Sequence, residues 1–183
     1  MKKIIGALTV IFLLLLSAYK SDAQNTEWTI VSSTVSFKIK NAGFNIDGKF
    51  GEVNGIIIFD ASKNTGNSID ATIDAKTINT GNDMRDGHLK KKDYFDITTY
   101  PKINMKGNLF SKEKDGTFKG YFKLTLKNKT KEIIVPMSFI ETGDKGQFKA
   151  TFTIDRLDYG VGESSMILSD NATIAIEVNV IKK

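Results

Sequence analysis

The sequence predicts an all-β protein, an eight-stranded antiparallel barrel with a short helix in one long loop. Three observations lead to this fold class. Apolar and polar residues alternate with period two in eight segments, turn-forming residues join most of them, and no long stretch has helical periodicity. Each strand must bury one apolar face, either in a sandwich or in a closed barrel. Only the barrel removes the sheet edges, and it is therefore the predicted architecture.

The first four predicted strands cover residues 35–39, 53–59, 69–73 and 103–109. In each, apolar residues recur at every second position between mostly polar ones, as in a half-buried strand. The turn-forming run 64–67 separates the second strand from the third. Their apolar faces consist of Val35, Phe37 and Ile39; Val53, Ile57 and Phe59; Ile69, Ala71 and Ile73; and Ile103, Met105 and Leu109.

The last four predicted strands cover residues 118–126, 133–139, 148–154 and 172–180. Turn chemistry at 114–116, 128–129 and 143–146 separates several of them. Such a barrel is wide enough either to be filled by side chains or to hold one small ligand, and periodicity leaves both open. Their apolar faces consist of Phe118, Phe122, Leu124 and Leu126; Ile133, Val135, Met137 and Phe139; Phe148, Ala150, Phe152 and Ile154; and Ala172, Ile174, Ile176, Val178 and Val180.

The N-terminus predicts export. Residues 1–3 are basic, 4–16 are apolar apart from two positions, and Ser21 and Ala23 precede Gln24 as in a signal-peptidase site. The apolar stretch is shorter than the roughly 20 residues that span a bilayer. We therefore expect residues 1–23 to be a cleaved signal peptide, residues 24–183 to be the folded domain, and the protein to be periplasmic or secreted.

Composition excludes several kinds of site. The chain has no Cys and one His, which removes disulfides, Cys-ligated metals and thiol nucleophiles, and no metal site is predicted. Loss of residues 1–23 lowers the formal net charge from +5 to +3. The remaining lysines fall on the polar strand faces, opposite the Phe residues, whereas nucleic-acid platforms interleave aromatic with basic residues. No nucleic-acid partner is expected.

Two long loops carry the candidate functional residues. Twenty-seven residues separate Asp74 from Lys102, and 17 separate Ile154 from Ala172. Loops of that length in a compact domain are usually functional. The first holds the only His and one of two Arg residues, and a short helix is predicted over about 84–93, capped by residue 82 or 83. The second holds the other Arg.

Arg85, Asp86 and His88 form a candidate polar cluster for an anionic or carbonyl head group, because Arg offers a rigid fork of donors. Alternatively, ion pairs of Arg85 with Asp86, or of Arg156 with Asp158, fasten the loops to the barrel. Catalysis has little support: no Gly-x-Ser-x-Gly motif, metal-ligand motif or nucleotide-binding loop is present, and no catalytic residue is predicted.

The sequence resembles the YceI-like family in several stretches between residues 27 and 183. The motif Asn82-x-x-Arg85-Asp86-x-His88-Leu89 is the most specific of them. Asn128 departs from the family pattern, which has Gly in that turn. Further matching stretches are Tyr94-Phe95-Asp96, Tyr100-Pro101, Leu124-Thr125-Leu126 with Thr130-Lys131, Arg156-x-Asp158-Tyr159-Gly160-Val161, Gly48-x-Phe50 and Gly55-x-Ile57-x-Phe59.

The resemblance implies a lipocalin-like barrel that holds polyisoprenoid or other lipids in an apolar channel, with no cofactor besides the bound isoprenoid lipid. By analogy, two sets of ligand-binding residues follow. The candidate channel walls are Phe37, Ile39, Phe59, Phe118, Phe122, Phe139, Phe152 and Ile176. The candidate mouth or lid residues are Asn82, Arg85, Asp86, His88, Arg156 and Tyr159.

The resulting hypothesis is an exported carrier or store for an isoprenoid lipid or quinone, a monomer or homodimer that contacts membranes transiently. One alternative is an enzyme acting on a lipophilic substrate, with His88 and Asp86 as acid and base. Another is a ligand-free envelope interaction module. The last would need an exposed apolar patch, for which the candidates are Ile56, Ile58, Ile134 and Ile181.

Overall fold

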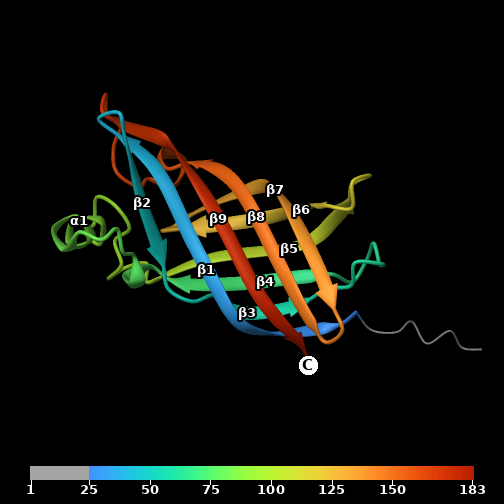
Figure 1. Ribbon diagram of the computed structural model, residues 1–183. Helices are drawn as coiled ribbons and strands as arrows, with labels where there is room; N and C mark the ends of the chain where they lie inside the picture. The colour runs from blue at the N-terminus through green and yellow to red at the C-terminus, as the bar shows by residue number, and fades with distance from the viewer. Residues whose placement is uncertain (1–24) are drawn as a thin grey trace, which may run out of the picture.

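Nine antiparallel strands form one sheet in the computed structural model, which describes residues 25–183 (Figure 1). The predicted signal peptide, residues 1–23, lies outside the described residues. The strands are β1 (Glu27–Asn41), β2 (Phe44–Phe50), β3 (Asn54–Ile58), β4 (Ser68–Asp74), β5 (Lys102–Lys112), β6 (Phe118–Leu126), β7 (Lys129–Thr142), β8 (Lys145–Asp155) and β9 (Leu168–Lys182).

Eight of these strands close into a barrel. Each strand from β3 to β9 pairs with the next, β3 also pairs with the start of β1, and β9 pairs with β1 along almost its whole length. The predicted eight-stranded antiparallel barrel is therefore confirmed. Closure leaves no free edge along these strands except where β1 and β3 diverge, so the backbone ladder holds a fold that has no disulfide.

Strand β2 was not predicted. It folds back from β1 through a turn at Ala42 and Gly43 and pairs with the second half of β1. Its other edge is joined to the chain by one bridge, between Lys49 and Asn79. Gly48 sits in β2 because the ring of Phe37 covers it, and an added Cβ would lie 2.2 Å from that ring.

One strand face also differs from the prediction. Leu109 was expected to point inward with Ile103 and Met105, but β5 has a register shift between Gly107 and Leu109. The extra residue reverses the alternation, so that Leu109 is 56% exposed and Phe110 enters the core. The four isoleucines considered as one outer patch are distributed over β3, β7 and β9.

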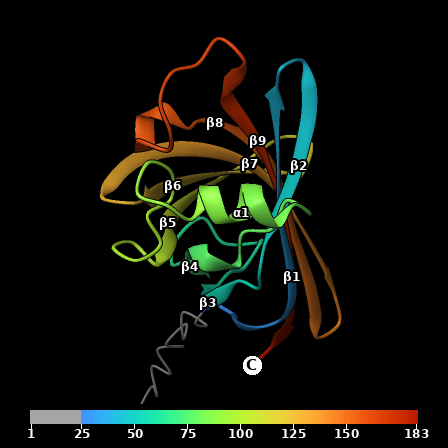
Figure 2. The same ribbon diagram turned by 90° about the vertical axis from the view of Figure 1, so that its left-hand side faces the viewer.

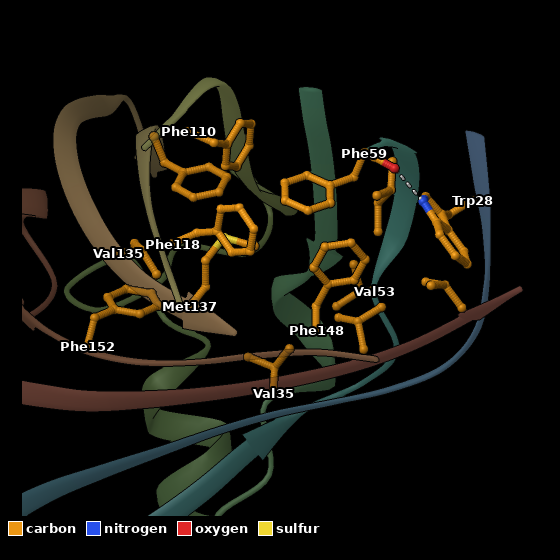
Figure 3. Packing of buried hydrophobic residues seen from close by; sticks show 14 residues of the cluster. Trp28, Val35, Val53, Phe59, Phe110, Phe118, Val135, Met137, Phe148 and Phe152 are labelled. Carbon is orange, nitrogen blue, oxygen red and sulfur yellow. Dashed lines mark hydrogen bonds between the residues drawn. The ribbon is translucent and has the colours of Figure 1, made fainter. Parts of the chain in front are cut away.

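Aromatic residues close one end of the barrel, where Trp28 and Phe59 meet (Figure 3). The indole Nε1 of Trp28 donates a 2.8 Å hydrogen bond to the carbonyl oxygen of Phe59, which ties β1 to the residue after β3. We call this closed end the aromatic floor. Its members are Trp28, Phe59, Phe110, Phe118, Phe139 and Phe148.

The opposite end carries the long loops and the short helices (Figures 1 and 2). Helix α1 (Asp83–Leu89) begins after Asn82, whose side chain accepts a hydrogen bond from the Arg85 amide, as the predicted cap should. It ends at Leu89, earlier than the predicted 93, and turns continue to about residue 99. Single 3₁₀ turns follow β4 (Ala75–Thr77) and β8 (Leu157–Tyr159).

Candidate functional site

A cavity of about 490 Å³ lies inside the barrel, between the aromatic floor and α1. All eight barrel strands, β2 and α1 contribute to its lining, which is overwhelmingly apolar. This volume falls within the range of about 300–1,000 Å³ typical of small-molecule sites. The barrel interior is therefore hollow toward its loop end and solid at its floor.

Five of the eight predicted wall residues line this cavity: Phe37, Ile39, Phe122, Phe152 and Ile176. The other three, Phe59, Phe118 and Phe139, point inward as expected but pack in the aromatic floor and do not line the cavity. Alternation shows which face of a strand is internal, but the depth at which the rings meet depends on how the strands stagger around the barrel.

The cavity lining also includes residues outside the predicted wall. Ile46 and Phe50 come from the unpredicted strand β2, and Phe95 from the long loop stacks edge-on against Phe50, with ring centroids 5.7 Å apart. Leu124 and Leu126 stand on the face of β6 that the alternation already marked as apolar. The alternation could have identified these two leucines. The residues next to Phe95 in the sequence show no pattern that predicts its position in the cavity.

Thr80 organises the mouth of the cavity. Its amide and hydroxyl both donate to Asp86 Oδ1, at 2.9 and 2.6 Å, and its hydroxyl accepts from Arg85 Nε at 2.7 Å. Arg85 Nη2 donates to the Thr80 carbonyl at 2.9 Å. Arg85 and Asp86 thus meet on Thr80 rather than forming the direct ion pair considered from the sequence. Asp86 is buried and anchors α1, while Arg85 and Thr80 line the cavity.

Asn82, the N-cap of α1, and His88 in α1 also line the mouth. His88 is exposed and packs edge-on against Tyr94, with ring centroids 5.2 Å apart. Arg85 Nη1 has no hydrogen-bond partner among residues 25–183, so it can donate to a polar group at the cavity mouth. The mouth therefore offers one fixed guanidinium and one imidazole beside an apolar interior.

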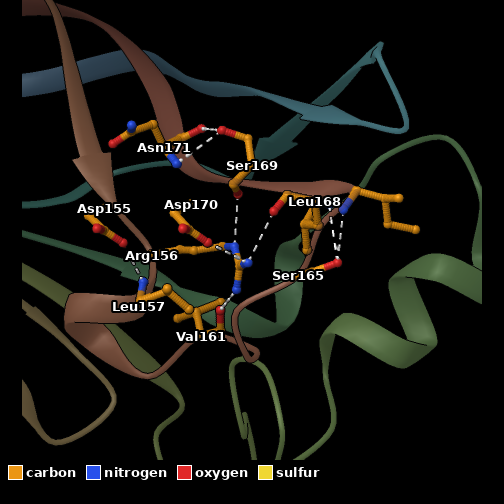
Figure 4. Close-up of polar contacts among 10 residues, drawn as sticks. Asp155, Arg156, Leu157, Val161, Ser165, Leu168, Ser169, Asp170 and Asn171 are labelled. Atoms are coloured by element: carbon orange, nitrogen blue, oxygen red, sulfur yellow. Dashed lines mark hydrogen bonds and ion pairs between the residues drawn. The ribbon is translucent and has the colours of Figure 1, made fainter.

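Arg156 is buried at the end of β8 and fastens the second long loop (Figure 4). Its guanidinium donates to the carbonyls of Ser169, Val161 and Leu168 and to Asp170 Oδ1. The Arg156–Asp158 ion pair considered from the sequence is wrong, because Asp158 pairs with Lys131 at 3.0 Å. Arg156 lines the cavity, but most of its donors are used within the loop.

Tyr159, predicted at the mouth, lies beneath the loop in a second apolar cluster and does not line the cavity. It is 2% exposed, and its hydroxyl has no hydrogen-bond partner among the described residues. Burial, reinforced by the negative charge of Asp158, raises the pKa of Tyr159 from 10.0 to about 12. The folded protein thus holds this phenol in its neutral form.

Replacement of Tyr159 by phenylalanine is expected to raise the free energy of unfolding by about 1 kcal/mol near pH 7, because it removes a buried, unpartnered hydroxyl. Since the pKa of Tyr159 is higher in the folded protein than in the unfolded chain, the wild-type protein keeps its full stability below about pH 10. It loses stability between pH 10 and about pH 12, where the unfolded chain ionises first, and the phenylalanine variant lacks this loss. Urea unfolding at pH 7 and 11 measures both effects. Lower stability of the variant at pH 7 would contradict the account.

Residues 25–183 also bear on two other kinds of site. Within that range, no three His, Asp or Glu side chains gather in a way that could hold a metal ion. The same residues contain no helix with the length and apolar character needed to cross a membrane.

Comparisons with known proteins agree with this geometry. A protein-family model described as the YceI-like domain matches residues 28–180. A UPF0312 protein of Pseudomonas savastanoi is 28% identical over 134 residues, which cover 69% of this chain and 70% of the relative.

Solved structures share the architecture. BcnA of Burkholderia cenocepacia superposes with a TM-score of 0.77 at 25% identity, covering 80% of this chain and 95% of BcnA. A polyisoprenoid binding domain from Saccharophagus degradans superposes with a TM-score of 0.70, covering 87% of this chain and 99% of that domain. At 14% identity, the second likeness concerns the fold alone.

Proposed function

The chain belongs to the YceI-like domain family, as its motifs predicted, and from that premise we propose that it is an exported lipid-binding protein. In this proposal the barrel holds the hydrocarbon chain of an isoprenoid lipid, either a polyisoprenoid or an isoprenoid quinone, for transport or storage. The observation that carries the proposal is the apolar cavity of about 490 Å³.

The cavity suits a long hydrocarbon better than a polar ligand. Its inner wall is built from Phe, Ile, Leu, Val and Met side chains, and its polar lining residues gather mainly toward the mouth. Burial of each CH₂-sized group supplies about 0.8 kcal/mol before ordering costs, so a few isoprene units provide useful affinity. The Saccharophagus degradans domain that shares this fold is described as a polyisoprenoid binding domain, which supports the same ligand class.

The polar end of the lipid is proposed to lie at the mouth, against Arg85 and His88. Arg85 Nη1 has no hydrogen-bond partner among residues 25–183 and can donate to a phosphate or carbonyl oxygen, and two hydrogen bonds to Thr80 fix the orientation of the guanidinium. Affinity then comes from the apolar wall, while the mouth selects the head group.

We propose binding without catalysis. The acid–base alternative requires His88 and Asp86 to act together on a substrate. The carboxylate of Asp86, however, accepts two hydrogen bonds from Thr80 and is buried at the base of α1, whereas His88 is exposed and packs against Tyr94. This arrangement supports a structural role for Asp86.

Native mass spectrometry of gently purified protein tests the proposal. We expect a wild-type chain that begins at Gln24 and carries a bound isoprenoid lipid. Replacement of Ala150 by tryptophan places a large ring in the cavity, because Ala150 lines it, and should strongly reduce the bound fraction. The same spectrum tests export, because the mass of the chain shows whether residues 1–23 have been removed.

Thr151→Trp is the matched control, because Thr151 is the next residue of β8 and points to solvent. This variant should keep the wild-type ligand. Equal ligand content in the two tryptophan variants would show that the lipid binds elsewhere, and a wild-type protein that is always empty would contradict the proposed function.

A further inference from the structure

The three most exposed large hydrophobic side chains of residues 25–183 all lie at the loop end of the barrel. Met166 is fully exposed, Met84 is 87% exposed and Phe44 is 75% exposed. Ile167, next to Met166, is 62% exposed. We call these four residues the apolar rim. Large apolar side chains gathered at one exposed place usually mark a surface that contacts a partner or a membrane.

The rim is formed by three segments that surround the cavity mouth. Phe44 stands at the tip of the β1–β2 hairpin, Met166 and Ile167 at the tip of the β8–β9 loop, and Met84 in the first turn of α1. The two tips lie side by side, because the Ala42 amide donates a 2.7 Å hydrogen bond to the Ile167 carbonyl. Figure 2 shows α1 beneath both tips, at the same end of the molecule.

The rim continues the apolar surface of the cavity. Phe44, Ile46 and Phe50 occupy alternate positions of β2 and share one face, and both Ile46 and Phe50 line the cavity. Leu168, which follows Ile167, and Met84 itself also line it. An apolar track therefore leads from the interior to the exposed tips.

Neither tip carries a charge. Residues 41–46 and 164–168 are uncharged, and the charged residues next to them in sequence are Lys40, Asp47 and Glu163. The outer strand faces are different, since their lysines form ion pairs such as Lys106 with Asp70 and Lys149 with Glu177. Charged side chains are costly to place within a bilayer, so uncharged apolar tips are suited to entering its interface.

We propose that the apolar rim docks the protein on the surface of a lipid bilayer, with the cavity mouth facing the membrane. This inference rests on the proposed function, because a lipid ligand would then pass between bilayer and cavity without crossing water. Four side chains on two loop tips and one helix turn are few for a second copy of the chain, since stable protein interfaces engage about 20–30 residues on each side.

Flotation with phosphatidylcholine vesicles tests the inference. The wild-type protein should float with the vesicles, and equally well at low and high salt, because the tips are uncharged. The triple variant Phe44→Ser, Met166→Ser and Ile167→Ser should partition onto the vesicles at least about tenfold less than the wild type, because each substitution removes apolar surface that the bilayer would bury. Equal partition of this variant and the wild type would overturn the proposal.

A triple variant of the outer wall is the matched control. Leu109, Ile134 and Ile140 are 56%, 58% and 60% exposed on β5 and β7. Replacement of all three by serine removes a comparable amount of exposed apolar surface away from the mouth. This variant should float as the wild type does, and an equal loss in both triple variants would overturn a docking role specific to the rim.

Binding of geranylgeraniol without vesicles separates this inference from the proposed function. Phe44, Met166 and Ile167 do not line the cavity, so the rim variant should bind this probe as the wild type does. Normal probe binding without vesicle binding by the wild type would overturn docking alone. Vesicle binding without probe binding would contradict the proposed function.

A wild-type dimer that becomes monomeric in the rim variant, with no flotation of either, would assign the rim to self-association and overturn the proposal.

Discussion

Replacement of Phe59 by alanine is expected to lower the free energy of unfolding by about 3–5 kcal/mol, the range for deleting a buried phenyl ring. Phe59 has no exposed surface, and its ring makes edge-on contacts with four others, those of Phe110, Phe118, Phe139 and Phe148, at centroid distances of 5.1–5.4 Å. Both the lost ring contacts and the void left at the centre of the floor contribute to this loss of stability.

Urea unfolding followed by the fluorescence of the single tryptophan measures this effect, because Trp28 stands in the same floor. The indole of Trp28 donates its hydrogen bond to the main-chain oxygen of residue 59, which the alanine variant keeps. The loss of stability therefore measures the contribution of the phenyl ring. Phe44→Ala is the matched control: the same atoms are removed from a side chain that is 75% exposed, and a change below about 0.5 kcal/mol is expected. Similar losses in the two variants would contradict the central role of the floor.

Replacement of Arg156 by alanine should cost about 2–4 kcal/mol and release the second long loop. The Arg156 side chain is 5% exposed and satisfies three main-chain carbonyls and the carboxylate of Asp170. A hydrogen bond that involves a charged group contributes about 1.5–3 kcal/mol to stability. The expected loss is smaller than their sum because Asp170 is 41% exposed and regains water.

Hydrogen exchange of the amides between residues 157 and 170 measures the local effect, and urea unfolding measures the global one. Arg156→Lys should recover little, since an ammonium cannot reproduce a planar fork with separate donors for several carbonyls. Asp158→Ala is the control from the same loop, because its exposed pair with Lys131 should contribute less than about 1 kcal/mol. If lysine restores protection fully, charge rather than geometry holds the loop.

Much of the barrel could be predicted because each of its eight strands has a hydrophobic pattern of its own. Strand β2 was missed because its pattern depends on a distant contact. Asn45, Asp47 and Gly48 weaken its strand propensity, and only the ring of Phe37 on the neighbouring strand explains why position 48 has no side chain.

The site was less predictable than the fold. That Phe59 and Phe152 are both internal follows from their strands, but that one closes the floor and the other lines a cavity depends on the three-dimensional stagger of the barrel. Thr80 gave no signal in sequence, although it joins Arg85 to Asp86. The partner of Arg156 was misassigned because the pairing of β8 with β9 brings Asp170, fourteen positions away, closer than Asp158.

The function proposed for this protein requires the hollow end of the barrel to hold an isoprenoid chain. The native mass spectrum of the wild-type chain, followed by extraction and identification of what it carries, tests this claim most directly. We expect one isoprenoid lipid per chain, retained by Thr151→Trp and lost from Ala150→Trp. A barrel that is consistently empty, or one that carries the same lipid after its cavity has been filled, would contradict it.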